Sequence, residues 1–422
     1  MAALAFISRA AATAPSMPLR LSPFRDNNAA APSTPRRLSP LHSSSSPIFS
    51  RHRIEVFRQH LIGSPSRNHV SCQKYLRARD TPAKARATAF TSASATASGA
   101  PQGERKRVVI TGGSKGLGYA MAEEFLSMGD SVVICGRNNN RLTAAVDALR
   151  RSEKAANGDD LDSSDAEFSA EPPSLRVWGI RCDVASAADL AGLAEFAVAR
   201  MGGVDIWINN AGQVTSKSLL ADVAPSDIAS AVSTNVLGSL LGCREAIRVM
   251  RQQQADAPAA SSSSTPLYHI FNLGFSRWGA AFTRSAATHK ATKMALSQLT
   301  TSLNDELKQA GLTSIAVHNL SPGMVLTDLL LKDSTPIARR FFNALAEEPE
   351  TVAAAIVPLI RSVAGPNENV EYMSPVDAFV RVITGVPQIV KGGRFFDGNG
   401  DRVMQPGNEY ASNGVKRQFY DP

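Results

Sequence analysis

Two side chains suited to proton chemistry lie four residues apart in the segment AATHKATKMAL, residues 286–296: His289 and Lys293. In a helix this spacing places both side chains on one face, one turn apart. An imidazole with its ordinary pKa near neutrality can act as a general acid, while a neighbouring ammonium disfavours its charged form. The pair therefore predicts a site that handles protons, with the competence of the histidine left open.

A second chemical feature is the glycine-rich run TGGSKGLG at residues 111–118, which follows an apolar β-branched segment and precedes a helical one. Glycines permit a tight turn and let main-chain amides approach a phosphate, and a helix N-terminus favours negative charge. The placement between strand and helix predicts a dinucleotide site. The residues expected to bind the cofactor there are Thr111, Gly112, Ser114, Lys115, Gly116, Leu117 and Gly118.

The run CGRNNN at residues 135–140 bears on the choice of cofactor. Sites that prefer NADH usually place an acid here for the ribose 2′-hydroxyl, whereas Arg137 offers a fork for a 2′-phosphate. Lys115 adds positive charge to the same pocket. The sequence favours NADPH over NADH, although two ordinary surface cations would explain the same residues.

The segments around these motifs alternate between strand and helix patterns. The expected strands are 107–111, 131–135, 176–180, 204–208, 267–273 and 314–319, and the expected helices are 117–128, 139–152, 186–201, 226–252 and 287–310. Strands that are apolar on both faces and separated by helices imply a parallel sheet covered on both sides. We therefore predict an α/β fold with a Rossmann-type, doubly wound parallel sheet.

Charge is distributed unevenly along the 422 residues. Residues 1–100 carry 14 Lys and Arg against 3 Asp and Glu, whereas the rest carries 31 against 34. Residues 1–104, rich in Ser, Ala, Pro and Arg, are typical of a transit peptide, chloroplast more than mitochondrion; an arm retained on the protein is the alternative. Because the basic excess lies there, we expect no nucleic-acid partner.

The domain boundaries follow from composition. We expect one domain over residues 105–400, interrupted by solvated loop insertions at 152–174 and 252–266, and a polar tail at 401–422 without an assigned role. The cysteines lack metal-ligand spacing, so no metal is expected. No uninterrupted apolar run reaches the length of a membrane-spanning helix.

Several motifs together resemble the short-chain dehydrogenase/reductase family over roughly residues 105–335. They are CDV, NNAG, TNVLG, a serine 13 residues before position 289, and SPGMVLTD. The resemblance implies catalytic roles for Asn235, Ser276, His289 and Lys293. It implies cofactor contacts for Asp183, Val184, Asn209, Ala211, Gly212, Lys293, Pro322, Gly323 and Thr327.

A narrower resemblance is to the chlorophyll(ide) b reductases of plants and green algae, through stretches such as VDIWINNAG and VHNLSPGMVLTDLLL. It implies a chlorophyll b-type tetrapyrrole as substrate, whose C7 formyl group NADPH reduces to hydroxymethyl. It also implies a chloroplast location, in the stroma or peripherally on thylakoids, and a homo- or hetero-oligomer with a related reductase.

The family usually has a tyrosine, its proton donor, where this chain has His289. Three interpretations follow: the imidazole serves as the acid, a hydroxyl such as that of Thr288 replaces it, or the site binds NADPH or pigment without turnover and stabilises an active relative. Losing general-acid catalysis costs roughly 10²- to 10⁴-fold in rate.

Overall fold

The computed structural model describes residues 104–157, 175–256, 266–275 and 285–419. Nearly all of the predicted leader, most of both predicted insertions and Ser276 lie outside these residues. Everything below concerns the described part of the chain.

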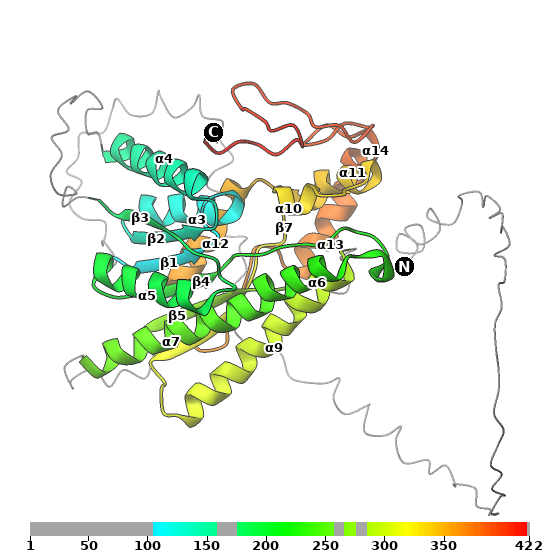
Figure 1. Cartoon of the computed structure of the whole chain (residues 1–422). Helices are drawn as coiled ribbons and strands as arrows, with labels where there is room; N and C mark the ends of the chain where they lie inside the picture. The colour runs from blue at the N-terminus through cyan, green and yellow to red at the C-terminus, as the bar shows by residue number, and fades with distance from the viewer. Residues whose placement is uncertain (1–103, 158–174, 257–265, 276–284, 420–422) are drawn as a thin grey trace, which may run out of the picture. The chain divides into compact units, whose positions relative to one another are not determined.

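A seven-stranded parallel sheet forms the centre of the fold (Figure 1). Its strand order is β3-β2-β1-β4-β5-β6-β9, with every neighbouring pair parallel. The strands are β1 Arg107–Thr111, β2 Ser131–Gly136, β3 Val177–Arg181, β4 Ile206–Asn209, β5 Tyr268–Leu273, β6 Ile315–Ser321 and β9 Asn369–Glu371. This arrangement confirms the predicted doubly wound fold, and its strand order reverses between β1 and β4, where such sheets bind ligands.

Helices cover both faces of the sheet (Figure 1). One apolar cluster joins the sheet to α3 Gly116–Ser127, α4 Asn139–Asn157 and α12 Pro349–Ser362. A second cluster joins the other face to α5 Ala187–Met201, α7 Gly238–Asp256 and α9 Ala287–Gln309. Strands β1, β2, β4, β5 and β6 are almost wholly buried between these layers, as their continuous apolar runs predicted, whereas the edge strands β3 and β9 are partly exposed.

The segment before α7 departs from a regular α-helix. Helix α6, Pro225–Val232, continues into a π-helical stretch at Ser233–Leu237 (η3) and then into α7. Within η3, Asn235 is fully buried. A π-helical turn inside a helix often marks a functional site.

A smaller layer follows β6. It contains β7 Met324–Val325, α10 Asp328–Leu331, α11 Pro336–Leu345, β8 Ala346–Glu347, α13 Pro375–Thr384 and α14 Val386–Lys391. A third apolar cluster, including Leu326, Phe342 and Phe396, joins this layer to the chain after α14. The short helices α10 and α11 occupy the stretch after the PG motif, and Phe342 belongs to their core.

The ends of the predicted segments differ from the structure in three places. Helices α4 and α7 continue to Asn157 and Asp256, into the predicted insertions, because SEKAAN and RQQQAD are largely good helix formers. Strand β9 was missed because three residues give no readable pattern. Residues 392–402 form only isolated bridges, and residues 401–419 of the predicted polar tail fold back onto the domain. Within the described ranges, no helix is both long and apolar enough to cross a bilayer.

Candidate functional site

The predicted site residues on described segments follow the carboxyl ends of β1, β2, β3, β4 and β6 or lie on η3 and α9. The glycine-rich loop follows β1, the NNAG segment follows β4, and the PG segment follows β6. Because carboxyl ends of parallel strands share one edge, loops far apart in the sequence meet there.

The glycine-rich loop has the geometry that requires glycine. Gly112 and Gly116 have φ angles of 66° and 58°, in the region that L side chains rarely adopt. A methyl group at Gly118 would lie 2.4 Å from the carbonyl oxygen of Gly112 and 2.5 Å from Asn210 Nδ2. Helix α3 starts at Gly116 with no side-chain cap on its first turn, so its N-terminal amides remain available to an anion.

The NNAG segment holds that loop in place through hydrogen bonds. Thr111 Oγ1 accepts from the main-chain amides of Asn210 and Ala211, each at 3.1 Å. Asn210 Nδ2 donates to the carbonyl oxygens of Thr111 and Gly112 at 2.9 and 3.1 Å. Two of the predicted motifs thus form a single scaffold.

The side chain of Asn209, a predicted cofactor contact, points into the core. Its side chain is buried and lies in a core network: Trp207 Nε1 donates to its Oδ1 at 2.9 Å, and its Nδ2 donates to Asn272 Oδ1 at 3.0 Å. The side chain is therefore a structural group, and only the main chain of Asn209 is left for a cofactor.

The PG segment meets the glycine-rich loop from the opposite side. A methyl group at Gly116 would lie 3.1 Å from Thr327 Cγ2, and Lys115 forms an ion pair with Asp328 at the start of α10. Asp328 also accepts from Asn413 Nδ2 at 2.7 Å. Although burial works against it, hydrogen bonding to Lys115 and Asn413 holds the pKa of Asp328 below its ordinary value. Lys115 is consequently engaged within the protein.

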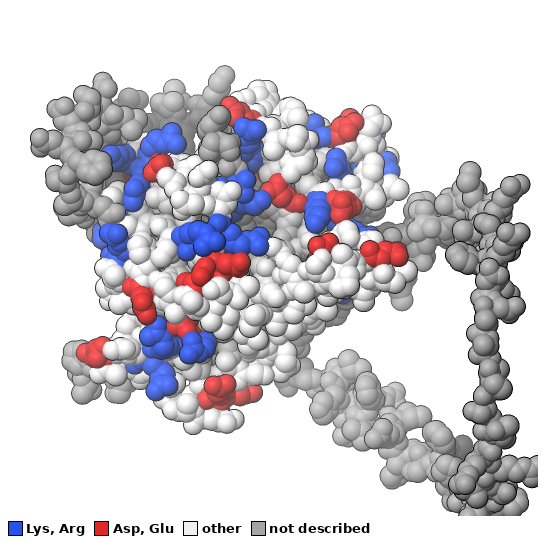
Figure 2. All heavy atoms as spheres, viewed as in Figure 1, with Lys and Arg blue, Asp and Glu red and all other residues white. Residues whose placement is uncertain are grey.

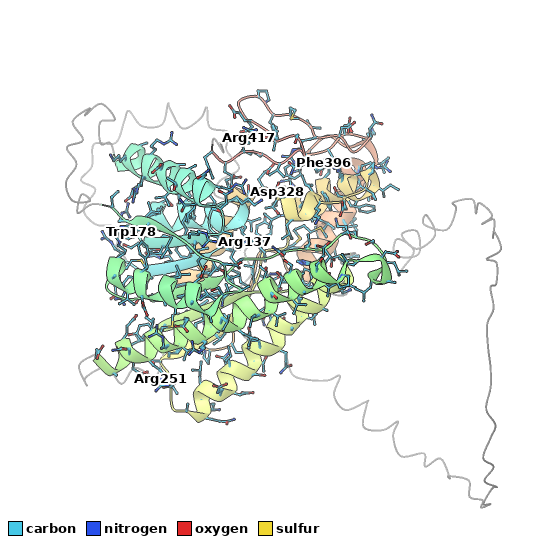
Figure 3. The ribbon with its side chains drawn as sticks, in the orientation of Figure 1. Arg137, Trp178, Arg251, Asp328, Phe396 and Arg417 are labelled. Atoms are coloured by element: carbon cyan, nitrogen blue, oxygen red, sulfur yellow. The ribbon has the colours of Figure 1, made fainter. Side chains whose placement is uncertain are left out.

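Arg137 extends from the end of β2 toward the NNAG segment (Figure 3). The side-chain amide of Gln213 satisfies both Arg137 and Ser230 in one of its two orientations. In that orientation Gln213 Oε1 accepts from the Arg137 guanidinium at 2.8 and 3.0 Å, and Gln213 Nε2 donates to Ser230 Oγ at 2.8 Å. Arg137 is exposed, and Lys and Arg side chains gather near the centre of this face (Figure 2). An anion at this position would compete with the Gln213 amide for the guanidinium.

Asp183 and Val184 follow β3. Asp183 Oδ1 accepts from the amide of Ala185 at 3.0 Å, so the carboxylate stabilises its own turn. Val184 is buried, and a methyl group on Gly238 of α7 would lie 2.7 Å from Val184 Cγ2. The turn is thereby fixed against the helix layer, beside the end of β2.

Asn235, which lies on η3, connects helix α9 to the residue that follows the NNAG segment. Its Oδ1 accepts from the amide of Gln213 at 2.8 Å, and its Nδ2 donates to the carbonyl oxygen of Gln213 at 2.9 Å and to Thr292 Oγ1 at 3.0 Å. A methyl group at Gly212 would lie 3.5 Å from Asn235 Oδ1 and 3.6 Å from Lys293 Nζ. Asn235, Gly212 and Lys293 therefore border one small space.

His289 lies on α9, buried to 8% exposure, with its ring edge-on to Phe275 at 5.4 Å between centroids. Burial, together with the charge of Lys293, lowers the pKa of His289 to about 4, against the opposing effect of a hydrogen bond with the Gln213 main chain. Among the residues that the structure describes, its Nδ1 has no hydrogen-bond partner. The imidazole is therefore neutral near pH 7, with one ring nitrogen free to accept.

Lys293 is also buried. Its Nζ donates to the carbonyl oxygen of Leu273, at the end of β5, at 2.7 Å. Desolvation lowers the pKa of Lys293 to about 8. The Lys293 ammonium therefore loses its proton at mildly alkaline pH.

The other hydroxyl groups that could replace His289 as a proton donor have contacts or positions elsewhere. Thr288 Oγ1 is buried and lies 2.6 Å from Thr215 Oγ1. Tyr119 packs against Phe419, and Tyr268 begins β5. Ser276, the predicted partner for the substrate oxygen, lies outside the described residues.

Comparison with known proteins gives the family. The short chain dehydrogenase family matches residues 106–171 and 155–336. The chain belongs to the short-chain dehydrogenase family. Family membership confirms the resemblance predicted from the motifs, and with it the class of NAD(P)H-dependent oxidoreductases.

Two relatives confirm the narrower similarity. "Chlorophyll(ide) b reductase NOL, chloroplastic" from Oryza sativa subsp. japonica is 38% identical over 281 residues, covering 66% of this chain and 71% of the relative. "Probable chlorophyll(ide) b reductase NYC1, chloroplastic" from the same organism is 36% identical over 298 residues, covering 71% of this chain but 55% of the relative. The chain thus spans about half the length of the NYC1 relative.

Among solved structures, a 3-ketoacyl-(acyl-carrier-protein) reductase from Brucella melitensis, complexed with NADH, is 23% identical and covers 64% of this chain and 98% of its own. Its TM-score is 0.49.

The residues of this short-chain dehydrogenase fit a nicotinamide cofactor. The glycine turn and the uncapped start of α3 would hold the pyrophosphate, and Arg137 would be the candidate for the adenosine end. Lys293 Nζ lies beside Gly212, where a ribose would be bound, and the unpartnered Nδ1 of His289 marks a polar contact still to be made.

Sequence reasoning missed several residues of this site. Gln213 connects Arg137, Asn235 and His289, and Asp328 binds Lys115. Both directly follow predicted motifs, so adjacency to NNAG and to Thr327 was the available signal. Gln418 and Asn413 lie in the tail, and nothing in their local sequence indicates contact with the site.

Proposed function

We propose that this chain is an NADPH-dependent carbonyl reductase that acts on chlorophyll b-type tetrapyrroles, converting the C7 formyl group to hydroxymethyl. One observation carries the proposal: Gln213 contacts Arg137 on the cofactor side and both Asn235 and His289 on the proton side. Both proposed halves of the site, the one for phosphate and the one for protons, therefore contact the same residue. The similarity to chlorophyll(ide) b reductases supports the substrate class.

The proposed preference for NADPH depends on Arg137. Lys115 is occupied by Asp328, so the guanidinium of Arg137 is the group left to bind a 2′-phosphate in a bidentate manner. The present partner of Arg137 is the neutral amide of Gln213, which binds a guanidinium more weakly than a phosphate dianion does. We expect the phosphate to replace it.

Bound NADPH would supply the hydride for the carbonyl carbon. His289, neutral at pH 7, keeps its one N–H on the Gln213 main chain, so its Nδ1 would face the reacting groups as an acceptor and would have to gain a proton before it could donate to the carbonyl oxygen. Lys293, with a pKa of about 8, would be the proton source: Nδ1 of His289 would take its proton and release it to the carbonyl oxygen, which leaves Lys293 neutral and the imidazole as it began. Asn235 fixes the Gln213 main chain against which the imidazole is held.

A second candidate is favoured by the same histidine. A neutral imidazole is a poor acid, and the unpartnered Nδ1 suits a group that binds without delivering a proton. In this candidate the chain binds NADPH or pigment without turnover and stabilises an active relative as part of an oligomer. The leader would, in either case, be a chloroplast transit peptide, and contact with thylakoids would be peripheral.

Hydride transfer separates the two candidates. Purified protein would be mixed with NADPH and chlorophyllide b while nicotinamide absorbance and the 7-hydroxymethyl product are followed. The reductase predicts product formed at a rate that shows no inflection near pH 6.5 and declines as the pH rises through about 8, where Lys293 loses its proton. Tight NADPH binding without product would establish the silent subunit and refute the reductase.

Replacing His289 with tyrosine sharpens the test. A phenol beside the Lys293 ammonium restores a stronger proton donor, so we expect His289→Tyr to raise kcat by about 10²-fold or more. His289→Phe, which retains an aromatic ring, should lower it. If His289→Tyr lowers kcat in a folded protein, the imidazole is the adapted donor.

A further inference from the structure

The tail after α14 returns to the cofactor site. It forms two small antiparallel turns, bridged at Phe396–Arg402 and Tyr410–Lys416, and a methyl group on Gly414 would lie 3.3 Å from Arg402 Cβ. The two turns therefore pack on each other. Figure 3 shows Phe396 and Arg417 in this layer, above Asp328.

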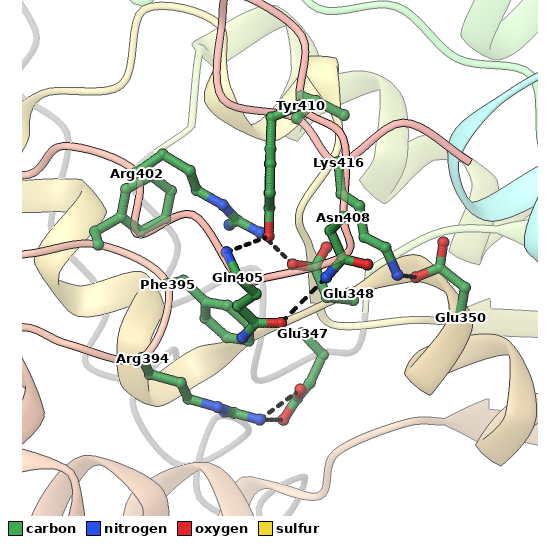
Figure 4. A network of polar contacts seen from close by, with 12 residues as sticks. Glu347, Glu348, Glu350, Arg394, Phe395, Arg402, Gln405, Asn408, Tyr410 and Lys416 are labelled. Atoms are coloured by element: carbon green, nitrogen blue, oxygen red, sulfur yellow. Dashed lines mark hydrogen bonds and ion pairs between the residues drawn. The ribbon is translucent and has the colours of Figure 1, made fainter. Parts of the chain in front are cut away.

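Three glutamates beside β8 anchor the tail (Figure 4). Glu347 accepts from Arg394 at 2.8 Å, Glu348 pairs with Arg402, and Glu350 lies 3.8 Å from Lys416. The Arg402 side chain is only 4% exposed, and its guanidinium lies over the rings of Phe395, Phe396 and Tyr410. Buried pairing of this kind holds a segment in one arrangement, because breaking it leaves an uncompensated charge.

The end of this anchored tail touches the phosphate-binding loop. Gln418 Nε2 donates to the carbonyl oxygen of Gly116 at 3.1 Å and to Glu350 Oε1 at 3.2 Å. Phe419 packs on Tyr119 of α3 with 4.8 Å between ring centroids. Gly116 is one of the two glycines of the turn with positive φ.

This contact has a consequence for the amide that follows. A peptide unit is planar and trans, so its carbonyl and N–H point in opposite directions. Holding the Gly116 carbonyl against the tail aims the Leu117 N–H away from it, as one of the free donors at the start of α3. Asn413 acts on the other wall, because it binds the Asp328 carboxylate that pairs with Lys115.

We propose that residues 409–419 position the cofactor site: Gln418 fixes the Gly116 peptide, and Asn413 fixes the Lys115–Asp328 pair, so that the loop is preorganised for the pyrophosphate. The inference rests on the proposed NADPH-binding function and adds to it a set of positioning residues far from the motif. No residue of the tail is required to touch the substrate.

The test compares Gln418→Ala with Gln405→Ala in the full chain. Gln405 is an exposed residue of the same tail whose amide accepts from Asn408, within the tail. Dissociation constants for NADPH, KM for NADPH, kcat and Tm would be measured for both. Loss of one hydrogen bond predicts an increase of about 2- to 10-fold in Kd and KM for Gln418→Ala, with kcat and Tm near those of the parent and with Gln405→Ala unchanged.

Hydrogen exchange on the cofactor-free protein gives an independent readout. Gln418→Ala should speed exchange of main-chain amides within residues 112–120 and leave those of α5 unaffected. If Gln418→Ala leaves both NADPH affinity and this exchange at parental values, the positioning role is wrong while the proposed function stands. A parent chain that binds no NADPH would refute the cofactor assignment, and with it the role of the tail.

Discussion

The two halves of the site differ in what they depend on. The phosphate-binding half is built from main chain: glycines with positive φ, a helix start, and hydrogen bonds between Thr111 and Asn210. The proton-handling half depends on the side chains of His289 and Lys293, whose pKa values burial moves to about 4 and about 8. Main-chain geometry survives substitution of many side chains, whereas a single exchange at position 289 alters the chemistry.

The largest expected effect lies in the proton-handling half. Replacing Lys293 with methionine keeps the aliphatic volume, removes the ammonium and its hydrogen bond to Leu273, and takes away the proposed proton source. We expect kcat to fall by roughly 10²- to 10⁴-fold.

The control is Lys308→Met, which makes the same exchange at an exposed position in the last turn of the same helix. It should leave kcat unchanged. Burying the Lys293 charge costs free energy in the parent, and the methionine variant avoids this cost. The Tm of Lys293→Met should therefore not be markedly lower than that of the parent. A Lys293→Met protein as active as the parent would remove lysine from the mechanism.

In the phosphate-binding half the decisive change is Gly118→Ala. Its methyl group would overlap the Gly112 carbonyl and the Asn210 amide, and overpacking of this kind costs about 1–3 kcal/mol. We expect NADPH affinity to fall by roughly 10- to 100-fold, as measured by fluorescence titration.

Gly192→Ala is the matched control, since Gly192 lies within α5 and a methyl group there meets nothing within 4 Å. It should leave the affinity unchanged and stabilise the protein by roughly 0.5–1 kcal/mol, because alanine is the better helix former. Equal effects of the two substitutions would show that the loop is not shaped as described.

A smaller effect is expected at Arg137, because it is a side-chain contact at the edge of the main-chain site. Removing one charge-assisted contact by Arg137→Ala should weaken NADPH binding by about 10-fold or somewhat more and leave NADH binding nearly unchanged. Arg151→Ala, an exposed change on the outer end of α4, should affect neither cofactor. Equal losses for NADPH and NADH would exclude recognition of the 2′-phosphate by Arg137.

The same contrast explains how much the sequence predicted. The six longer strands and the glycine turn were readable because periodicity and glycine spacing are local. Contacts such as Lys115–Asp328 and Gln418–Gly116 join residues 213 and 302 positions apart, and no local pattern encodes them. The sequence indicated that Lys293 would disfavour a charged His289, but burial, the larger cause, becomes visible only in the fold. The core position of the Asn209 side chain could not be predicted, because the motif does not reveal which way a strand-end side chain points.

Two buried histidines at the opposite end of the sheet allow the effect of burial on a histidine pKa to be tested separately from catalysis. His269 Nδ1 lies 3.0 Å from His318 Nε2, and His318 Nδ1 accepts from the Glu368 amide at 3.2 Å. Burial lowers the pKa of His269 to about 4, with a contribution from Lys106, and lowers the pKa of His318 as well. The contacts of this pair are with each other, with Phe271 and with the Glu368 amide, not with His289 or Lys293.

Both histidines bind protons less readily in the folded protein than in the unfolded chain. Their contribution to the free energy of unfolding should therefore be fully present above about pH 6.5 and be lost as the pH drops toward 4. For His269 alone this loss is of the order of 3 kcal/mol across that window. Chemical denaturation of the parent and of His269→Gln at several pH values measures it: the variant should lose less stability on acidification. Because His269 is outside the site, kcat at pH 7 should be the same in both proteins, whereas His289→Gln should lessen the acid sensitivity and also change kcat. A parent whose stability is flat from pH 6.5 to 4 would mean that these imidazoles titrate normally, and the neutral state assigned to His289 on the same physical grounds would then lose its support.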